Sequence, residues 1–172
     1  LDVDYDGAAK LREKYKGKKI IFSLGRLVPY KGYKYLIDSA RHLDDSYVIL
    51  IGGGGPLKGN LKEQIEASGL QDKVKLLGFL EDSEVPAYFG ACDLFCMSSV
   101  YATEAFGIVQ IEAMSAGKPV VATKIPGSGV SWVNEHKGSG VNVKPKDSEA
   151  LAIAFRHILE SPDTYSNYSE QA

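Results

Sequence analysis

Two cations in this sequence lie where an anionic ligand would bind. Arg26 and Lys31 are five residues apart, in a loop that ends at Gly32, where a helical pattern begins. A helix N-terminus favours anions through its free N–H groups and its dipole, so this loop suits a phosphate group. The loop is neither a Walker loop nor a Gly-x-Gly-x-x-Gly turn. Taken alone, it is equally explained as a turn that carries two solvated cations.

Two glutamates, Glu104 and Glu112, lie eight residues apart after the fourth strand-like run. If both were helical, about 12 Å of rise and about 80° of rotation would separate them. We expect Glu104 in the loop before the helix and Glu112 one to two turns inside it. Together they would span an elongated polyol such as a nucleoside diphosphate sugar, with N–H groups of Phe106, Gly107 and Ile108 facing the same ligand. Each glutamate alone is also explained as a solvated surface residue.

The elements that must position these residues alternate between short β-branched runs and helical patterns. Strands are expected at 19–24, 47–51, 74–77, 93–97, 119–123 and 140–143. Helices are expected at 32–43, 59–68, 84–92, 106–116 and 148–160. This alternation predicts an α/β fold with a parallel sheet covered on both faces. Ligands of such sheets bind outside the carboxyl ends of the strands, which is where the candidate loops fall.

Length and composition exclude several classes of protein. The 172 residues, 44% of them hydrophobic, suit one domain with a real core. The net charge of −2 gives no basic excess for a nucleic-acid partner. The longest apolar runs are far shorter than the ~20 residues of a transmembrane helix. Cys92 and Cys96 are too few for a disulfide scaffold or a structural zinc site, and they indicate buried thiols in a reducing compartment.

Two glycine-rich loops can each be explained in more than one way. Glycines 52–55 follow the second expected strand, where the backbone either turns tightly or approaches a ligand closely. Residues 127–130 form a similar loop after the fifth strand, with no clear role, and Trp132 beyond it is expected to pack. Residues 1–17 are expected to lead in from a preceding domain, 18–160 to form the binding domain, and 161–172 to form a helix end and a frayed tail.

The segment EAFGIVQIEAMSAGKPVVA, from Glu104 to Ala122, closely resembles the signature of the retaining GT-B glycosyltransferases of glycosyl transferases group 1. In that signature two glutamates bracket seven residues, and the next strand begins Gly-x-Pro-Val-Val. The loop from Gly25 to Gly32 resembles the diphosphate loop of the family, glycines 52–54 its second-strand glycine run, and 74–80 its nucleobase strand. The resemblance covers most of the chain, roughly 20–159.

The resemblance implies a Rossmann-like doubly wound sheet of about six strands that forms the C-terminal, donor-binding half of a GT-B fold. Arg26 and Lys31 would contact the diphosphate and stabilise the charge on the leaving nucleoside diphosphate, while Glu104 would contact hydroxyls of the transferred sugar. Glu112 would bind the ribose, and the backbone of Leu80 would read the base. Further donor contacts are implied for Gly25, Gly53, Phe106, Gly107 and Ile108.

The implied activity is retaining transfer of a hexose, mannose or glucose, from a UDP- or GDP-sugar to a hydroxyl of a polysaccharide, glycolipid or small molecule, as in cell-envelope polysaccharide biosynthesis. No metal ion and no other cofactor is expected. The acceptor would bind an N-terminal domain missing from this chain, so the isolated domain is expected to bind nucleotide but to be largely inactive. We expect a cytoplasmic location, with peripheral contact to the inner membrane face through the missing domain.

Two alternative functions remain. One is a sugar-nucleotide epimerase or a phosphorylase of similar architecture; the spaced glutamates argue against the epimerase, and the lack of a cofactor-binding lysine motif argues against the phosphorylase. The other is a degenerate nucleotide-binding module that recognises a partner. That module is disfavoured because both cations and both glutamates are retained.

Overall fold

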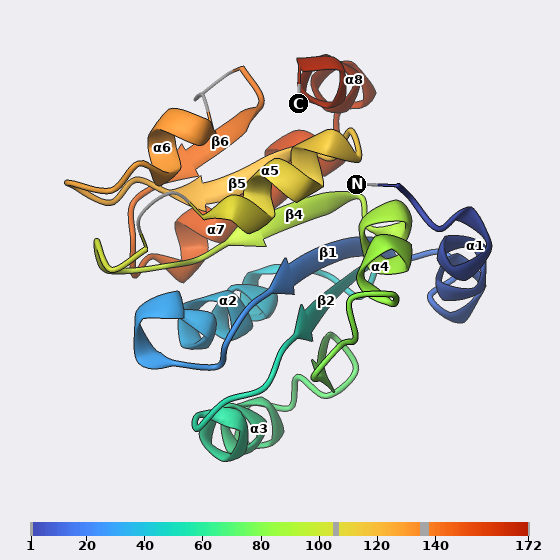
Figure 1. Ribbon diagram of the computed structural model, residues 1–172. Helices are drawn as coiled ribbons and strands as arrows, with labels where there is room; N and C mark the ends of the chain where they lie inside the picture. The colour runs from blue at the N-terminus through green and yellow to red at the C-terminus, as the bar shows by residue number, and fades with distance from the viewer. Residues whose placement is uncertain (1, 105–106, 135–137, 172) are drawn as a thin grey trace.

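The computed structural model describes residues 2–104, 107–134 and 138–171. These residues form one parallel six-stranded sheet with the order β3-β2-β1-β4-β5-β6 (Figure 1). The strands are β1 (Lys19–Leu24), β2 (Tyr47–Gly52), β3 (Val74–Gly78), β4 (Leu94–Met97), β5 (Val120–Thr123) and β6 (Gly140–Val143). This is the strand order of the doubly wound Rossmann fold, in which the order of the strands reverses between β1 and β4. The predicted fold class is confirmed.

Helices cover both faces of the sheet, as Figure 1 shows with α5 in front of β4 and β5 and α7 behind. The α-helices among the described residues are α1 (Tyr5–Lys14), α2 (Tyr33–Ser39), α3 (Lys58–Ala67), α4 (Val85–Ala91), α5 (Ile108–Ser115), α6 (Val130–Val133), α7 (Ser148–Leu159) and α8 (Pro162–Gln171). Short 3₁₀ turns at Pro29–Lys31 and Ala40–His42 flank α2.

The core is split by the sheet into two hydrophobic clusters of described residues. Ile21 of β1 faces the cluster that contains α2, α3 and α7, while its neighbours Ile20 and Phe22 face the cluster of α4 and α5. This follows from the two-residue period of a strand, which sends successive side chains to opposite faces. The rings of Phe22 and Phe89 meet edge to face at 5.4 Å between centroids. A sheet with both faces buried explains why its strands are nearly continuous apolar runs.

The two ends of the chain differ from the sequence-based expectation. Residues 5–14, where the sequence shows only a weak helical pattern, form α1, which lies beside α4 (Figure 1). Arg12 ties this helix to the sheet through a bidentate pair with Asp93, whose carboxylate also accepts the N–H of Ile20 at 2.7 Å. The prediction of a frayed C-terminal tail is wrong. These residues form helix α8, because Tyr168 is buried in the core cluster of α2, α3 and α7. Tertiary contacts stabilise both helices.

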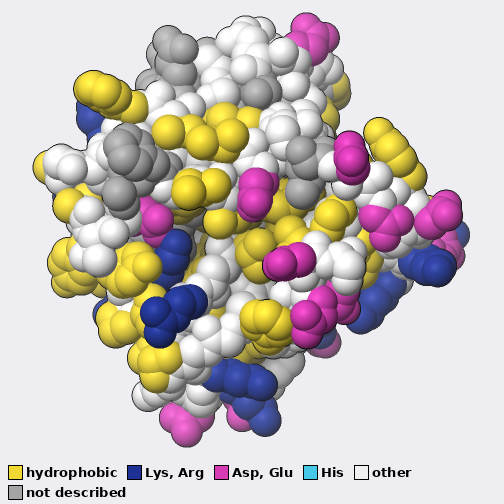
Figure 2. All heavy atoms as spheres, viewed as in Figure 1, with side chains coloured by type: hydrophobic (Ala, Val, Ile, Leu, Met, Phe, Trp, Pro, Cys, Tyr) yellow, Lys and Arg dark blue, Asp and Glu magenta, His cyan; other side chains and the backbone are white. Residues whose placement is uncertain are grey.

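Both cysteines are buried and unpaired, as expected, and burial raises the pKa of the Cys92 thiol to about 12. On the face shown in Figure 2, basic, acidic and hydrophobic side chains are interspersed. Among the described residues, no helix has the length and apolar character needed to cross a membrane.

Candidate functional site

The candidate loops meet at the point where the strand order reverses. The loop after β1 leads into α2, and the loop after β4 leads into α5, so both lie at the carboxyl edge of adjacent strands. They are in close contact at Gly32, which caps α2 with φ of +66°; a Cβ there would lie 2.1 Å from the carbonyl oxygen of Ser98. Only glycine meets both requirements. Doubly wound sheets bind their ligands at this reversal point.

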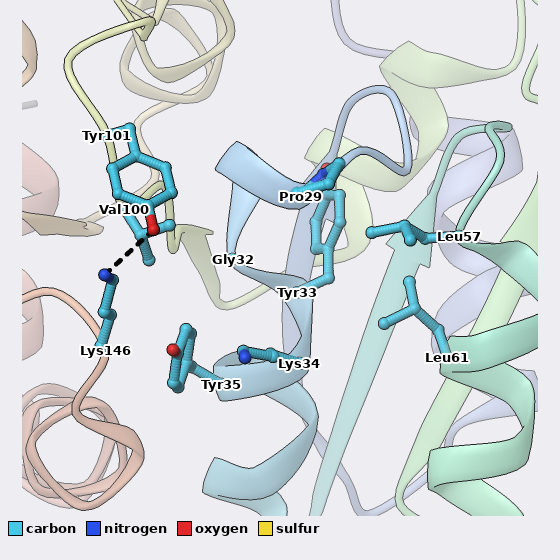
Figure 3. A pocket seen from close by; sticks show the side chains of 10 residues that line it. All are labelled: Pro29, Gly32, Tyr33, Lys34, Tyr35, Leu57, Leu61, Val100, Tyr101 and Lys146. Carbon is cyan, nitrogen blue, oxygen red and sulfur yellow. Dashed lines mark hydrogen bonds between the residues drawn. The ribbon is translucent and has the colours of Figure 1, made fainter.

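Two hollows open near this edge. One is a cavity of about 270 Å³ between the loop after β1, α3 and Tyr101 (Figure 3). The other is a narrow recess at the ends of β1 and β4, lined by Ser23, Lys31 and Ser99 among others, with about 10 Å³ of free volume. Lys31 lines the recess, and its ammonium pairs with Glu104.

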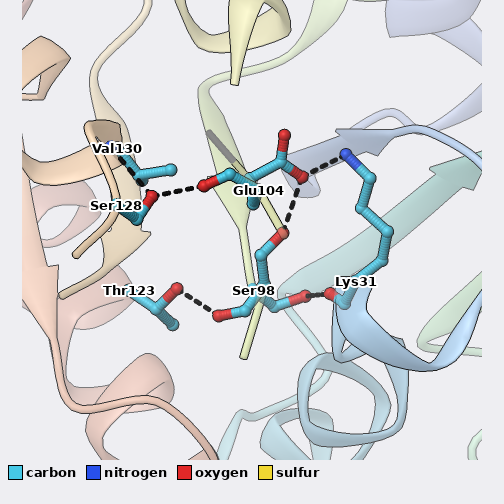
Figure 4. Close-up of polar contacts among 7 residues, drawn as sticks. Lys31, Ser98, Glu104, Thr123, Ser128 and Val130 are labelled. Carbon is cyan, nitrogen blue, oxygen red and sulfur yellow. Dashed lines mark hydrogen bonds and ion pairs between the residues drawn. The ribbon is translucent and has the colours of Figure 1, made fainter. Parts of the chain in front are cut away.

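Lys31 and Glu104 form an ion pair across the reversal point (Figure 4). Their side chains are only 13% and 11% exposed, although the residues are 73 positions apart in the sequence. The same carboxylate oxygen accepts the hydroxyl of Ser99 at 3.0 Å, and the Ser98 hydroxyl donates to the Lys31 carbonyl at 2.9 Å. The predicted sugar contact and one predicted phosphate contact are thus brought together and held by two serines.

The loop after β5 supports Glu104 from the other side (Figure 4). The hydroxyl of Ser128 donates to the backbone carbonyl of Glu104 and accepts the N–H of Val130 at 3.2 Å. Thr123, the last residue of β5, donates its hydroxyl to the carbonyl of Ser99. The glycine-rich loop 127–130 therefore positions Glu104. The sequence-based prediction missed Ser99 and Ser128. Ser99 lies two residues after the buried strand β4, which was a usable signal, whereas Ser128 lies five residues beyond β5.

Arg26 and Glu112 differ from this pair because they are open to a ligand. The Arg26 side chain is exposed, and within the described residues it forms no hydrogen bond or ion pair. Glu112 lies in the second turn of α5, partly exposed, and its carboxylate likewise has no partner in the described part of the chain. Gly107 is the N-cap of α5, and Ile108, 71% exposed, is its first residue. Phe106 lies outside the described residues.

The glycine run after β2 forms backbone contacts with the loop after β1. Gly53 has φ of +133°, and a Cβ there would lie 1.9 Å from the carbonyl oxygen of Gly25. The N–H of Gly25 donates to Gly52, and that of Leu27 donates to Gly54, at 3.0 and 2.9 Å. This close backbone packing is one physical reason for glycines at these positions. Gly53 thus helps to fix the loop that carries Arg26.

The predicted base contact, Leu80, lies just beyond β3. Its side chain is buried, whereas neither its N–H nor its carbonyl hydrogen-bonds to any described residue. Phe79 beside it is 72% exposed. Trp132 is 87% exposed, so the expectation that it packs is wrong; α6 is a single turn, and it buries Val130 instead.

The described residues offer no metal site. They contain no group of three or more His, Cys, Asp and Glu side chains arranged to hold a metal ion. The candidate charged groups are two cations and two carboxylates, of which the Lys31–Glu104 pair is mostly buried.

Fold and site together define a Rossmann-like domain with charged groups at its strand-reversal point. Residues 8–172 match the family described as Glycosyl transferases group 1. The chain is 32% identical over 171 residues to alpha-D-kanosaminyltransferase of Streptomyces kanamyceticus, covering 95% of this chain and 43% of that protein. It is 31% identical over 173 residues to O-antigen chain mannosyltransferase C of Escherichia coli, covering 99% and 45%.

The fold of this chain is also similar to that of a solved structure. Anabaena Alr3699/HepE in complex with UDP superposes with a TM-score of 0.89 at 29% identity, covering 98% of this chain and 47% of that one. The same protein has been solved with UDP-glucose. This chain belongs to the glycosyl transferases group 1 family. It spans less than half the length of these relatives, which is consistent with the expected C-terminal domain of a two-domain GT-B protein.

Proposed function

We propose that this domain binds the nucleoside diphosphate sugar of a retaining hexosyltransferase at the carboxyl ends of β1 and β4. The observation that carries the proposal is the Lys31–Glu104 pair at the strand-reversal point, with the exposed Arg26 in the same loop as Lys31. A site with cations on one loop and a carboxylate on the next suits a ligand whose phosphates adjoin hydroxyl groups.

The proposed roles follow the positions of the residues. Arg26 and Lys31 bind the diphosphate and stabilise the negative charge that grows on it as the glycosidic bond breaks. Glu104 accepts hydrogen bonds from hydroxyls of the sugar, and the N-terminus of α5, at Gly107 and Ile108, provides N–H donors for sugar or phosphate oxygens.

The nucleoside would lie along α5 and the end of β3. Glu112, one turn along α5 from Ile108, accepts hydrogen bonds from the ribose hydroxyls. The N–H and carbonyl of Leu80, which form no hydrogen bond to a described residue, recognise the base of UDP or GDP. The complexes of the Anabaena protein with UDP and UDP-glucose support UDP as the first nucleotide to test.

We further propose that the donor binds without a metal ion, because the two cations can neutralise the diphosphate themselves. The hydroxyl acceptor would be placed by a domain outside this chain, so this domain alone binds nucleotide and transfers little sugar. The name of the Escherichia coli relative, an O-antigen mannosyltransferase, supports a polysaccharide acceptor in the cell envelope. Peripheral contact with a membrane would then involve the other domain.

The test is titration calorimetry of the chain with UDP, GDP and ADP, each in EDTA and again with magnesium. We expect saturable binding of one nucleotide in EDTA, and an affinity at least about tenfold lower in Arg26→Ala. Arg41→Ala is the matched control, because Arg41 is an exposed arginine beyond the other end of α2. Binding that requires magnesium, or that is unchanged in Arg26→Ala, would overturn the proposed site.

A further inference from the structure

The 270 Å³ cavity beside the candidate donor site has a chemical character of its own. Figure 3 shows Tyr101, Lys146 and Tyr35 on one side of it and Leu57 and Leu61 on the other. Aromatic and aliphatic surfaces therefore form its walls. Its volume equals that of about nine liquid waters. That is room for one hexose ring with a phosphate group.

Two lysines, Lys34 and Lys146, border this cavity. The ammonium of Lys34 lies 4.9 Å from the centre of the Tyr35 ring, and that of Lys146 lies 4.5 Å from the centre of the Tyr101 ring. Lys146 also donates a hydrogen bond to the Tyr101 hydroxyl at 3.2 Å. Among the described residues, neither ammonium pairs with a carboxylate, so both remain able to bind an anion.

The backbone of Lys146 provides an independent observation. It has φ of +63°, and it is the non-glycine residue with positive φ in the described chain. Pro145 precedes it, a sequence typical of a type II turn, whose third position favours glycine or asparagine. A lysine at this position holds an unfavourable left-handed backbone conformation. Residues with such strained conformations are more common at ligand sites. The turn directs the ammonium to the rim of the cavity.

We propose that this cavity binds a phosphorylated monosaccharide. The ammonium groups of Lys34 and Lys146 bind the phosphate as point charges. The Tyr35 and Tyr101 rings pack against the C–H face of the sugar, because the electron-rich ring face attracts weakly positive hydrogens.

This site is separate from the candidate donor site, although the two share loops. Arg26, Glu112 and Leu80 do not line it, whereas Tyr33 and Tyr101 lie within three residues of Lys31 and Glu104 along the chain. The inference goes beyond the proposed donor function and does not depend on it.

The test is NMR titration of the chain with glucose 6-phosphate, glucose and inorganic phosphate. Glucose 6-phosphate should shift the amide resonances of residues 33–35, 100–101 and 146 with saturation. Glucose should not reach saturation over the same concentration range. Inorganic phosphate should bind the same two lysines with a dissociation constant at least about fivefold higher than that of glucose 6-phosphate.

Variants then separate binding from folding. Lys146→Gly and Lys34→Gln should each raise the dissociation constant for glucose 6-phosphate at least about fivefold. Lys146→Gly should keep or raise the melting temperature, because glycine accepts the positive φ. Lys62→Gln, an exposed lysine on α3, and Arg26→Ala should bind like the wild type. The proposal is overturned by a lack of saturable binding, by unchanged binding in both cavity variants, or by loss of binding in Arg26→Ala.

Discussion

Replacing Glu104 with glutamine tests whether the Lys31–Glu104 pair is the empty state of a donor site. In the structure the ammonium of Lys31 is paired with the carboxylate of Glu104. A diphosphate must therefore displace this carboxylate before it can bind Lys31. Glutamine still accepts the Ser99 hydroxyl but no longer holds Lys31 by charge. UDP should therefore bind about three- to tenfold more tightly, because an internal competitor and a repelling charge are both removed.

UDP-glucose should gain much less, because it loses the carboxylate that accepts hydrogen bonds from its sugar hydroxyls. The ratio of UDP-glucose affinity to UDP affinity should thus fall in Glu104→Gln. The substitution should cost about 1–2 kcal/mol of stability, less than the ~3–5 kcal/mol of a fully buried pair, since Lys31 can turn to solvent. For a chain of this size that lowers the melting temperature by about 2–8 °C.

The assay is calorimetry with UDP and UDP-glucose on wild type, Glu104→Gln and the exposed control Glu63→Gln, with melting curves for each. Lys31→Met and the double variant complete a thermodynamic cycle, which should show a coupling of at least about 1 kcal/mol. The reasoning would be refuted if Glu104→Gln bound UDP and UDP-glucose equally more weakly than the wild type. It would also be refuted if the stability losses of Glu104→Gln and Lys31→Met simply added in the double variant.

Three further predictions concern single residues. Glu112→Ala should weaken nucleotide binding by about 1–3 kcal/mol in calorimetry, through loss of charge-assisted hydrogen bonds, with little change in melting temperature; full wild-type affinity would remove Glu112 from the site. Gly53→Ala should lower the urea midpoint strongly, because its Cβ would lie 1.9 Å from a backbone oxygen, whereas Gly54→Ala has open space and should not. Cys92 and Cys96 should resist thiol reagents until the protein unfolds, since burial raises the pKa of each thiol; rapid labelling of the native protein would contradict this.

Much of the fold was predictable from local pattern. Each expected strand lies within one residue of an observed one, because a sheet buried on both faces requires continuous apolar runs that are visible in the sequence. Asp147 caps α7 through the N–H of Ala150 at 2.9 Å, as its position before the helical pattern indicates. Gly69 and Gly117 lie just beyond the ends of α3 and α5 with positive φ, a position where glycine is common.

Helices α1 and α8 and the exposure of Trp132 were not predictable in this way. The sequence of α8 is polar, and tertiary contacts stabilise the helix. Tyr168 is buried in the core cluster of α2, α3 and α7, and the Ser169 hydroxyl donates a hydrogen bond to the Gly117 carbonyl at 2.6 Å. Such contacts join distant parts of the chain, and local periodicity carries no information about them.

The sequence by itself determined the α/β class, the order of the elements, the family and the loops that carry the candidate charges, because period, turn residues and motif spacing are local properties. Only the tertiary structure decided which of those charges meet. It pairs Lys31 with Glu104, supports that carboxylate with Ser99 and Ser128, and brings Lys146 beside Tyr101. The physical reason is the strand order, which places β4 beside β1 and thereby joins loops that lie far apart in the chain.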